Sequence, residues 1–415
     1  MPLLALLACV HPAPPATGAC EEPAPAPFDA QAAWDELEET LREVYAYLER
    51  DDLDVEGLLA RTGERAVVAP DPPAFRALAH HATFAFTDPH LLVGPLTDDD
   101  PNVWPTSGDL ALTWDEGHFV VVDVRTDSAA AAAGIRPGAE LVSVDGESVR
   151  SRVEALWDGL VPEPSPAQWA YAATAVANGR RVGSRELGWA DGSTTTLANP
   201  RDLARAVSER PPLDKRVVDG ICVLRFQNSL GRDETIGAFD EAVAGCDGVV
   251  IDLRNTPSGG NTDVARAIIG HFVDEPRPYQ VHEIPAVERE TTVPRHFVEY
   301  AMPRAPRIPG RLAVLGGRWT GSMGEGLVIG LQAAAGARTF GTGLADLLGA
   351  LHSFELERSG AVIELGGEAL FRVDGLPRED FVPDVMFEAG EATTEGDPVA
   401  DAALAWVRSP PSAPR

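Results

Sequence analysis

Three short apolar runs in the second half of the chain most strongly constrain its fold. They span residues 220–228, 248–254 and 311–317, and each is followed by a stretch with helical spacing of apolar residues. Continuous apolar runs of this length are typical of strands that are buried on both faces of a sheet. The sequence therefore predicts an α/β fold with a layered sheet-and-helix core.

The residues ahead of this core predict two smaller units. Residues 28–100 predict a helical unit, because apolar residues recur at helical spacing over 30–50 and again over 71–86. The first of these stretches places on one helix face Trp34, Leu37, Leu41, Val44 and Leu48. In residues 101–199 apolar residues recur at every second position. This pattern predicts a β unit, with hairpins around Asp145-Gly146 and Asp191-Gly192. The core then spans 200–395, and 396–415 form a C-terminal helix and tail.

The N-terminus resembles an export signal. Residues 6–9 read Leu-Leu-Ala-Cys, the residue order of a bacterial lipoprotein cleavage box, and a Pro/Ala-rich stretch follows. We expect 1–27 to be a signal segment and tether, Cys9 to be lipidated, and the chain to be exported to the periplasm or cell envelope. Cys222 and Cys246 flank two apolar runs, and the sequence leaves open whether they form a disulfide or remain buried thiols.

Charge and residue spacing exclude several classes of partner. The chain has 64 acidic and 34 basic residues, a formal charge of −30, which repels phosphate backbones and anionic lipid. We expect no nucleic-acid partner, and membrane association only through the N-terminal anchor. The histidines and cysteines show no H-x-x-x-H or C-x-x-C spacing, so we expect neither a metal site nor a cofactor.

The segment whose residues best suit catalysis surrounds Ser322. A buried strand ends at Gly317, a short turn carries Ser322, and a helix begins directly afterwards. A serine in this position lies at the end of a sheet, where the first amides of the helix can stabilise an oxyanion. The same residues also fit an S-x-x-E capping box formed by Ser322 and Glu325, which is the purely structural alternative.

A second glycine-rich turn follows the strand at 248–254. It spans 255–261 with the sequence NTPSGGN, and it too lies at the carboxyl end of a buried strand. In α/β sheets, ligands gather at this end of the strands. Its amides are therefore candidates for a second oxyanion donor.

Four segments together resemble the tail-specific, or C-terminal-processing, serine peptidases. They are DLRNTPSGGN, WTGSMGE, VPD near the end, and AGIRPGAELVSVDG, which is similar to a circularly permuted PDZ domain. The resemblance implies a core related to the crotonase and Clp protease folds. It implies Ser322 as the nucleophile, with the amides of Met323, Gly259 and Gly260 in the oxyanion hole.

The general base separates the branches of this family. One branch uses a lysine after the serine, but the single lysine of this chain, Lys215, precedes the core strands. The tricorn-like branch instead uses a histidine ahead of the PDZ domain, a position that His90 in Asp88-Pro89-His90 resembles. An imidazole can accept a serine proton at neutral pH. The resemblance implies that Glu379 orients this histidine, and His352 is the alternative base.

We therefore expect a serine endopeptidase that cleaves protein or peptide substrates, with Ser322 as nucleophile and a histidine as base. The PDZ-like unit would bind an extended or C-terminal peptide segment as an added strand. The alternative is a non-catalytic binding protein on the same fold, since a fold alone does not determine function.

Overall fold

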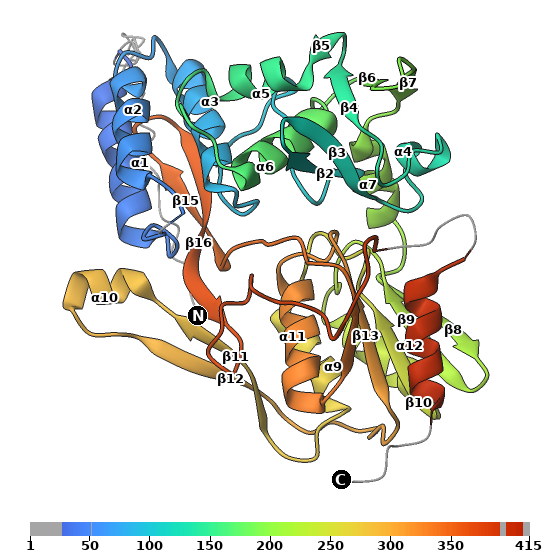
Figure 1. The fold of residues 1–415 in the computed structure, drawn as a ribbon. Coiled ribbons are helices and arrows are strands. Elements are labelled where there is room, and N and C mark those ends of the chain that lie inside the picture. Colours follow the sequence, from blue (N-terminus) through green and yellow to red (C-terminus); the bar gives the residue numbers. More distant parts are fainter. Residues whose placement is uncertain (1–26, 51, 391–395, 410–415) are drawn as a thin grey trace, which may run out of the picture.

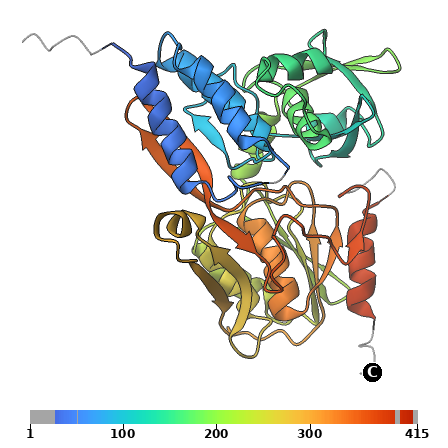
Figure 2. The same cartoon turned by 60° about the vertical axis from the view of Figure 1, so that its left-hand side comes forward.

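The computed structural model describes residues 27–50, 52–390 and 396–409. The expected signal segment with Cys9 lies outside the described residues. The N-terminal helices and the PDZ-like unit (residues 101–199) lie side by side above the sheet-and-helix core, as both views show (Figures 1 and 2). In the part of the chain that is described, no helix has the length and apolar character needed to cross a membrane.

A six-stranded sheet forms the centre of the core. Its strand order is β17-β14-β13-β10-β9-β8, and all neighbours are parallel except β8, which runs antiparallel to β9. The strands are β8 (Leu213–Val218), β9 (Ile221–Phe226), β10 (Gly248–Asp252), β13 (Leu312–Gly316), β14 (Arg338–Gly341) and β17 (Val385–Met386). Every residue of β10 and β13 is buried, which explains why these segments are apolar apart from Asp252, whose carboxylate is paired with Arg254.

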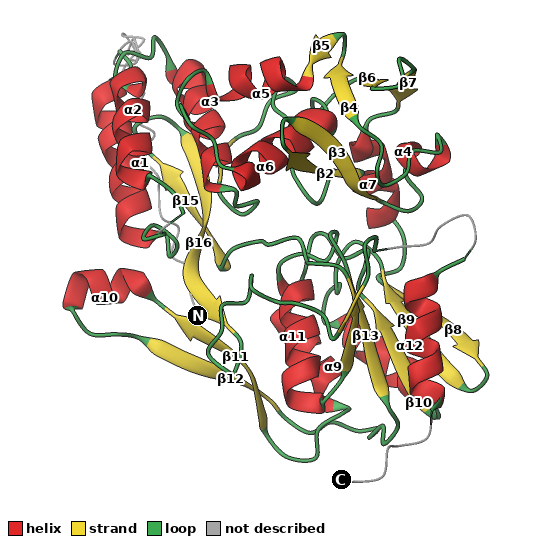
Figure 3. Ribbon diagram, viewed as in Figure 1, coloured by secondary structure: helices red, strands yellow, loops and turns green. Residues whose placement is uncertain are grey.

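Helices cover both faces of this sheet, which confirms the expected α/β architecture (Figure 3). One face packs against α8 (Glu234–Val243), α9 (Thr262–Gly270) and α11 (Met323–Ala335). The other face packs against α12 (Pro398–Arg408). A disulfide joins Cys222 on β9 to Cys246, which follows α8 in the chain. The sequence had left open whether these two cysteines are paired.

The N-terminal helices share their core with strands from the far end of the chain. A second, antiparallel sheet has the order β1-β16-β11-β12, with β15 paired to β16. Its strands are β1 (Leu92–Gly94), β11 (Arg277–Glu283), β12 (His296–Ala301), β15 (Ala350–Leu356) and β16 (Ala361–Phe371), and α10 (Pro285–Thr291) connects β11 to β12. Ile363 and Leu365 of β16 pack in one cluster with α1 (Ala30–Val44), α2 (Val55–Ala66) and α3 (Pro72–Thr83).

The first helix is shorter than its apolar pattern predicts. The pattern extends to Leu48, but α1 ends at Val44 and Tyr45 is extended. The Tyr45 hydroxyl donates to the carboxylate of Asp88, and the amide of Ala46 donates to the carbonyl of Gly366. These long-range hydrogen bonds compete with the next helical turn, so the helix prediction was wrong at this end.

The PDZ-like unit contains two small sheets. In one, β2 (Leu110–Asp115) pairs with β3 (His118–Val124), and the other has the order β5-β4-β6-β7. Its other elements are α4 (Ala129–Ala132), β4 (Leu141–Val144), β5 (Glu147–Ser148), α5 (Val149–Trp157), α6 (Pro166–Ala177), β6 (Arg185–Trp189) and β7 (Thr194–Leu197). A short 3₁₀ turn, η1 (Phe84–Phe86), precedes the unit, and α7 (Pro200–Ser208) follows it. Both predicted hairpins are confirmed, and Asp145 and Gly146 take the positive φ that a two-residue turn requires.

Candidate active site

Ser322 occupies the junction between β13 and α11 in an unusual backbone conformation. Its φ is 52° and its ψ is −122°, a combination that a non-glycine residue rarely adopts. The turn before it is held to the neighbouring strand, because the Thr320 hydroxyl donates to the carbonyl of Leu253 and the amide of Gly321 donates to that of Thr256. Backbone strain of this kind costs roughly 1–3 kcal/mol and clusters at active sites.

The structural alternative for Ser322, a capping box, is not formed. The Ser322 side chain makes no capping hydrogen bond to α11. The Glu325 carboxylate instead accepts from the amide of Asp346 at 2.8 Å and lies 3.3 Å from the guanidinium of Arg378. Burial raises the pKa of Glu325 to about 8, although Arg378 opposes this shift. The serine hydroxyl is therefore not committed to the helix.

The glycine turn after β10 lies directly against Ser322. A Cβ atom on Gly259 would stand 2.6 Å from the amide nitrogen of Met323 and 2.6 Å from Cβ of Ser322. Only a residue without a side chain leaves this space open, and its φ of 62° also favours glycine. The space borders the first amide of α11, where a substrate oxygen could be received.

The three expected oxyanion donors differ in their availability. The amide of Gly259 donates to the carbonyl of Thr256 at 3.1 Å, so it contributes space rather than the free donor that the sequence prediction assigned to it. Among the described residues, the amides of Met323 and Gly260 have no hydrogen-bond acceptor. The Met323 amide also lies at the positive end of the α11 dipole.

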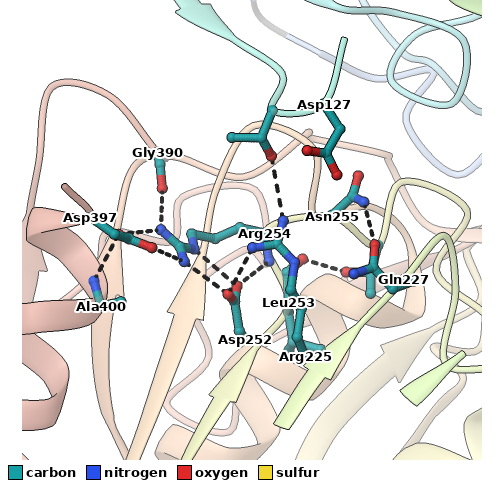
Figure 4. A network of polar contacts seen from close by, with 12 residues as sticks. Asp127, Arg225, Gln227, Asp252, Leu253, Arg254, Asn255, Gly390, Asp397 and Ala400 are labelled. Carbon is teal, nitrogen blue, oxygen red and sulfur yellow. Dashed lines mark hydrogen bonds and ion pairs between the residues drawn. The ribbon is translucent and has the colours of Figure 1, made fainter. Parts of the chain in front are cut away.

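A buried ion network supports the glycine turn from below (Figure 4). Arg254 lies between the carboxylates of Asp252 and Asp397, each at 2.8 Å. Burial raises the pKa of Asp252, but the neighbouring guanidinium groups outweigh it and hold that pKa well below its usual range. Beside them, Arg125 of the PDZ-like unit donates to the Asn255 side chain at 3.0 Å. The turn is thus fixed to both the core and the PDZ-like unit.

His90 is buried and is held by the loop that follows β14. Its Nδ1 atom lies 3.1 Å from the carbonyl oxygen of Leu348. Asp88 joins the two segments, because its carboxylate accepts from the amides of both His90 and Leu348. Burial lowers the pKa of His90 to about 4, with a partial offset from the Leu348 carbonyl. The imidazole is therefore neutral at pH 7, the state that a general base requires.

Arg378 connects the nucleophile region to the histidine region. Its guanidinium donates to the carbonyl of Ser322 at 3.4 Å and to the carbonyl of Leu347, next to the residue that holds His90. Sequence reasoning did not single out Arg378, and its only signal was its place beside Glu379. No hydrogen bond among the described residues joins His90 to the Ser322 hydroxyl or to Glu379.

The other candidate bases lie elsewhere. His352 lies on β15, partly exposed, with its Nε2 atom 3.6 Å from the Glu368 carboxylate, which also accepts from His282. Lys215 lies on the edge strand β8, which β10 and β9 separate from β13, and its amine donates to the carbonyl of Ala242. In the part of the chain that the structure describes, neither side chain forms a hydrogen bond or ion pair with Ser322.

A cavity of about 810 Å³ opens where the three units meet. Its lining includes Arg50 from the N-terminal unit, Trp104 and Tyr171 from the PDZ-like unit, and Asp346 and Glu379 from the core. Desolvation within the cavity wall raises the pKa of Asp346 to about 7, and the charge of Glu379 adds to this rise. Burial likewise raises the pKa of Glu379. The volume lies within the range of ligand-binding clefts, and the residues that line the cavity do not include Ser322 or His90.

Comparison with known proteins agrees with this description. Residues 221–385 match the family model described as Peptidase family S41, and residues 120–156 match a PDZ domain model. Mature CPAF in complex with lactacystin is 16% identical over 86% of this chain and 93% of that chain, with a TM-score of 0.55. The photosystem II D1 C-terminal processing protease is 14% identical over 86% and 93%, with a TM-score of 0.53. At these identities the likeness shows the fold. No curated protein matches the sequence of the chain.

Proposed function

Because this chain is a serine-type peptidase whose sequence matches the models of Peptidase family S41 and of a PDZ domain, we propose that it cleaves protein or peptide substrates by attack of Ser322 on a peptide carbonyl. The observation that carries the proposal is the arrangement of Ser322 with the Met323 amide and the open space at Gly259. When the serine oxygen attacks, the carbonyl oxygen becomes an anion. The Met323 amide borders this space and donates to the anion in this proposal. The Gly260 amide, which also has no acceptor among the described residues, is the candidate second donor.

His90 acts as the general base in this proposal. A carbonyl oxygen only accepts hydrogen bonds, so its approach to Nδ1 selects the tautomer with the proton on Nδ1. The lone pair then lies on Nε2, the nitrogen that takes the proton from Ser322. In this proposal the Leu348 carbonyl orients His90, the role that the sequence prediction gave to Glu379. The proposal requires a hydrogen bond between His90 and Ser322 that forms when substrate binds, as catalytic hydrogen bonds often do.

We further propose that the peptidase works in the cell envelope. The disulfide between Cys222 and Cys246 supports an oxidising compartment, because structural disulfides persist outside the reducing cytosol. The sequence prediction of a lipid anchor at Cys9 is consistent with this location.

Cleavage of a peptide library, read by mass spectrometry, tests the proposal. The chain without residues 1–26 is compared with its Ser322→Ala, His90→Ala and His352→Ala variants. Loss of cleavage in the first two variants and retention in the third is the expected result. Retention with Ser322→Ala rejects the nucleophile, and loss only with Ser322→Ala and His352→Ala moves the base to β15.

A further inference from the structure

The outer edge of β2 is the place where the PDZ-like unit could accept a peptide. The neighbouring strand β3 has both edges paired, with β2 on one side and residues 138–140 on the other. The free edge of β2 lies beside α6. An extended peptide adds to such an edge, because a helix alongside provides pockets for its side chains.

In this chain, side chains of α6 and its C-cap already satisfy the β2 edge. The side-chain oxygen of Asn178 accepts from the amides of Asp109 at 2.8 Å and Leu110 at 3.2 Å. Its side-chain nitrogen donates to the carbonyl of Leu110 at 2.9 Å. The Thr174 hydroxyl accepts from the amide of Leu112 at 3.0 Å and lies 3.5 Å from the carbonyl of the same residue. These are the donors and acceptors that an added strand would use.

Both side chains are buried and are themselves held in place. Asn178 is 1% exposed and Thr174 is 5% exposed. The Asn178 side chain also donates to the carbonyl of Thr174, and Asn102 donates to the carbonyl of Asn178. A peptide on this edge would have to displace two satisfied polar groups into apolar surroundings, where unpaired groups are unfavourable.

We propose that Thr174 and Asn178 are an internal ligand of the β2 edge, and that the PDZ-like unit accepts no added strand while they are in place. This differs from the peptide-binding role expected from the sequence, and it does not depend on the identity of the nucleophile. The closed edge continues into the core, because the Trp319 indole donates to the carbonyl of Gly108 at 2.9 Å. The PDZ-like unit then serves as a fixed wall beside the Ser322 turn.

Hydrogen exchange at single amides of the full chain carrying Ser322→Ala tests the closure. The amides of Asp109, Leu110 and Leu112 exchange slowly without any peptide. Asn178→Ala speeds exchange of Asp109 and Leu110 by about tenfold, the scale expected for the loss of one hydrogen bond. As a matched control, Asn261→Ala removes an amide at the start of α9, where it is hydrogen-bonded to Asp233 and Asp263, and leaves these three rates unchanged. Unchanged rates in Asn178→Ala would overturn the proposal.

Peptide binding to the same protein provides the second arm. The probes are fluorescein-labelled ten-residue peptides with a free carboxylate and an apolar last residue. We expect no added protection of Leu110 and Leu112 with Thr174 and Asn178 intact, and at least tenfold tighter binding once both are replaced by alanine. Added protection in the protein with both side chains intact overturns the proposal. Unchanged affinity in the folded double variant overturns the assignment of these side chains as an internal ligand.

Discussion

The Nδ1 atom of His90 lies 3.1 Å from the carbonyl oxygen of Leu348, a residue 258 positions later in the chain. This contact fixes the imidazole tautomer without a carboxylate. It also places a neutral base against the loop that carries Leu347. Arg378 donates to the carbonyl of Leu347 and to the carbonyl of Ser322, and so connects this loop to the nucleophile.

The protonation state of His90 is therefore predicted to resist acid. Burial lowers its pKa to about 4, so the ring stays neutral at pH 5.5, with its proton on Nδ1. The exposed ring of His118 is the internal control, because its hydrogen bond to Glu140 raises its pKa and keeps it protonated at that pH. Nitrogen-15 correlation spectra of the histidine rings distinguish these states. A doubly protonated His90 at pH 5.5 would contradict the assignment.

Replacement of Gly259 by alanine is predicted to impair catalysis. The added methyl group would stand 2.6 Å from the Met323 amide, in the space that receives the substrate oxygen. We expect kcat to fall about 10²–10³-fold, the effect of losing one oxyanion donor. Gly237→Ala, at an exposed position on α8 where a Cβ meets no atom within 4 Å, is the matched control. Equal kcat values for the two variants would argue against an oxyanion site at this turn.

The buried carboxyl of Glu325 is predicted to make stability depend on pH. Burial raises its pKa from 4.5 to about 8, so the unfolded chain loses this proton first as the pH rises. Its contribution to the free energy of unfolding is present below pH 4.5 and is lost as the pH rises through about 8. Between pH 5 and pH 8, Glu325→Gln should therefore gain more than about 1 kcal/mol relative to the parent chain. Urea unfolding at several pH values measures this difference, with Glu357→Gln on the surface as control.

Removal of the disulfide is predicted to destabilise the core. Cys222 and Cys246 close a loop of 24 residues, for which the loss of chain constraint corresponds to about 3 kcal/mol. The Cys222→Ala/Cys246→Ala variant should unfold at a lower urea concentration than the oxidised chain. Reductant should lower the midpoint of the parent chain and leave the variant unchanged. A midpoint that does not respond to reductant would mean that the two cysteines are unpaired in solution.

Local sequence patterns predicted the elements that carry the nucleophile. The uniformly apolar run before Gly317 and the glycines around Ser322 predict a strand, a turn and a helix, because these preferences act over few residues. The choice between a nucleophile and a helix cap could not be made locally. It depends on Asp346, which binds Glu325 from 21 positions away and so removes it from the cap.

Contacts between segments that are distant in the chain could not be predicted from the sequence. The pairing of β1 with β16 joins residues such as Val93 and Ile363, and no local pattern encodes that partnership. The same holds for Arg378, whose position depends on how the chain returns from β16 to the Ser322 turn. The PDZ-like pattern was recognised, but the closure of its β2 edge by Asn178 required the packing of α6.

Covalent labelling with a fluorophosphonate tests the central claim most directly. The reagent reacts with a serine oxygen only where a base and an oxyanion site activate it, and peptide mapping then locates the adduct. The account predicts a single adduct on Ser322, with labelling lost in Ser322→Ala and strongly slowed in His90→Ala. A chain that cleaves peptides while the adduct forms on another serine would contradict it.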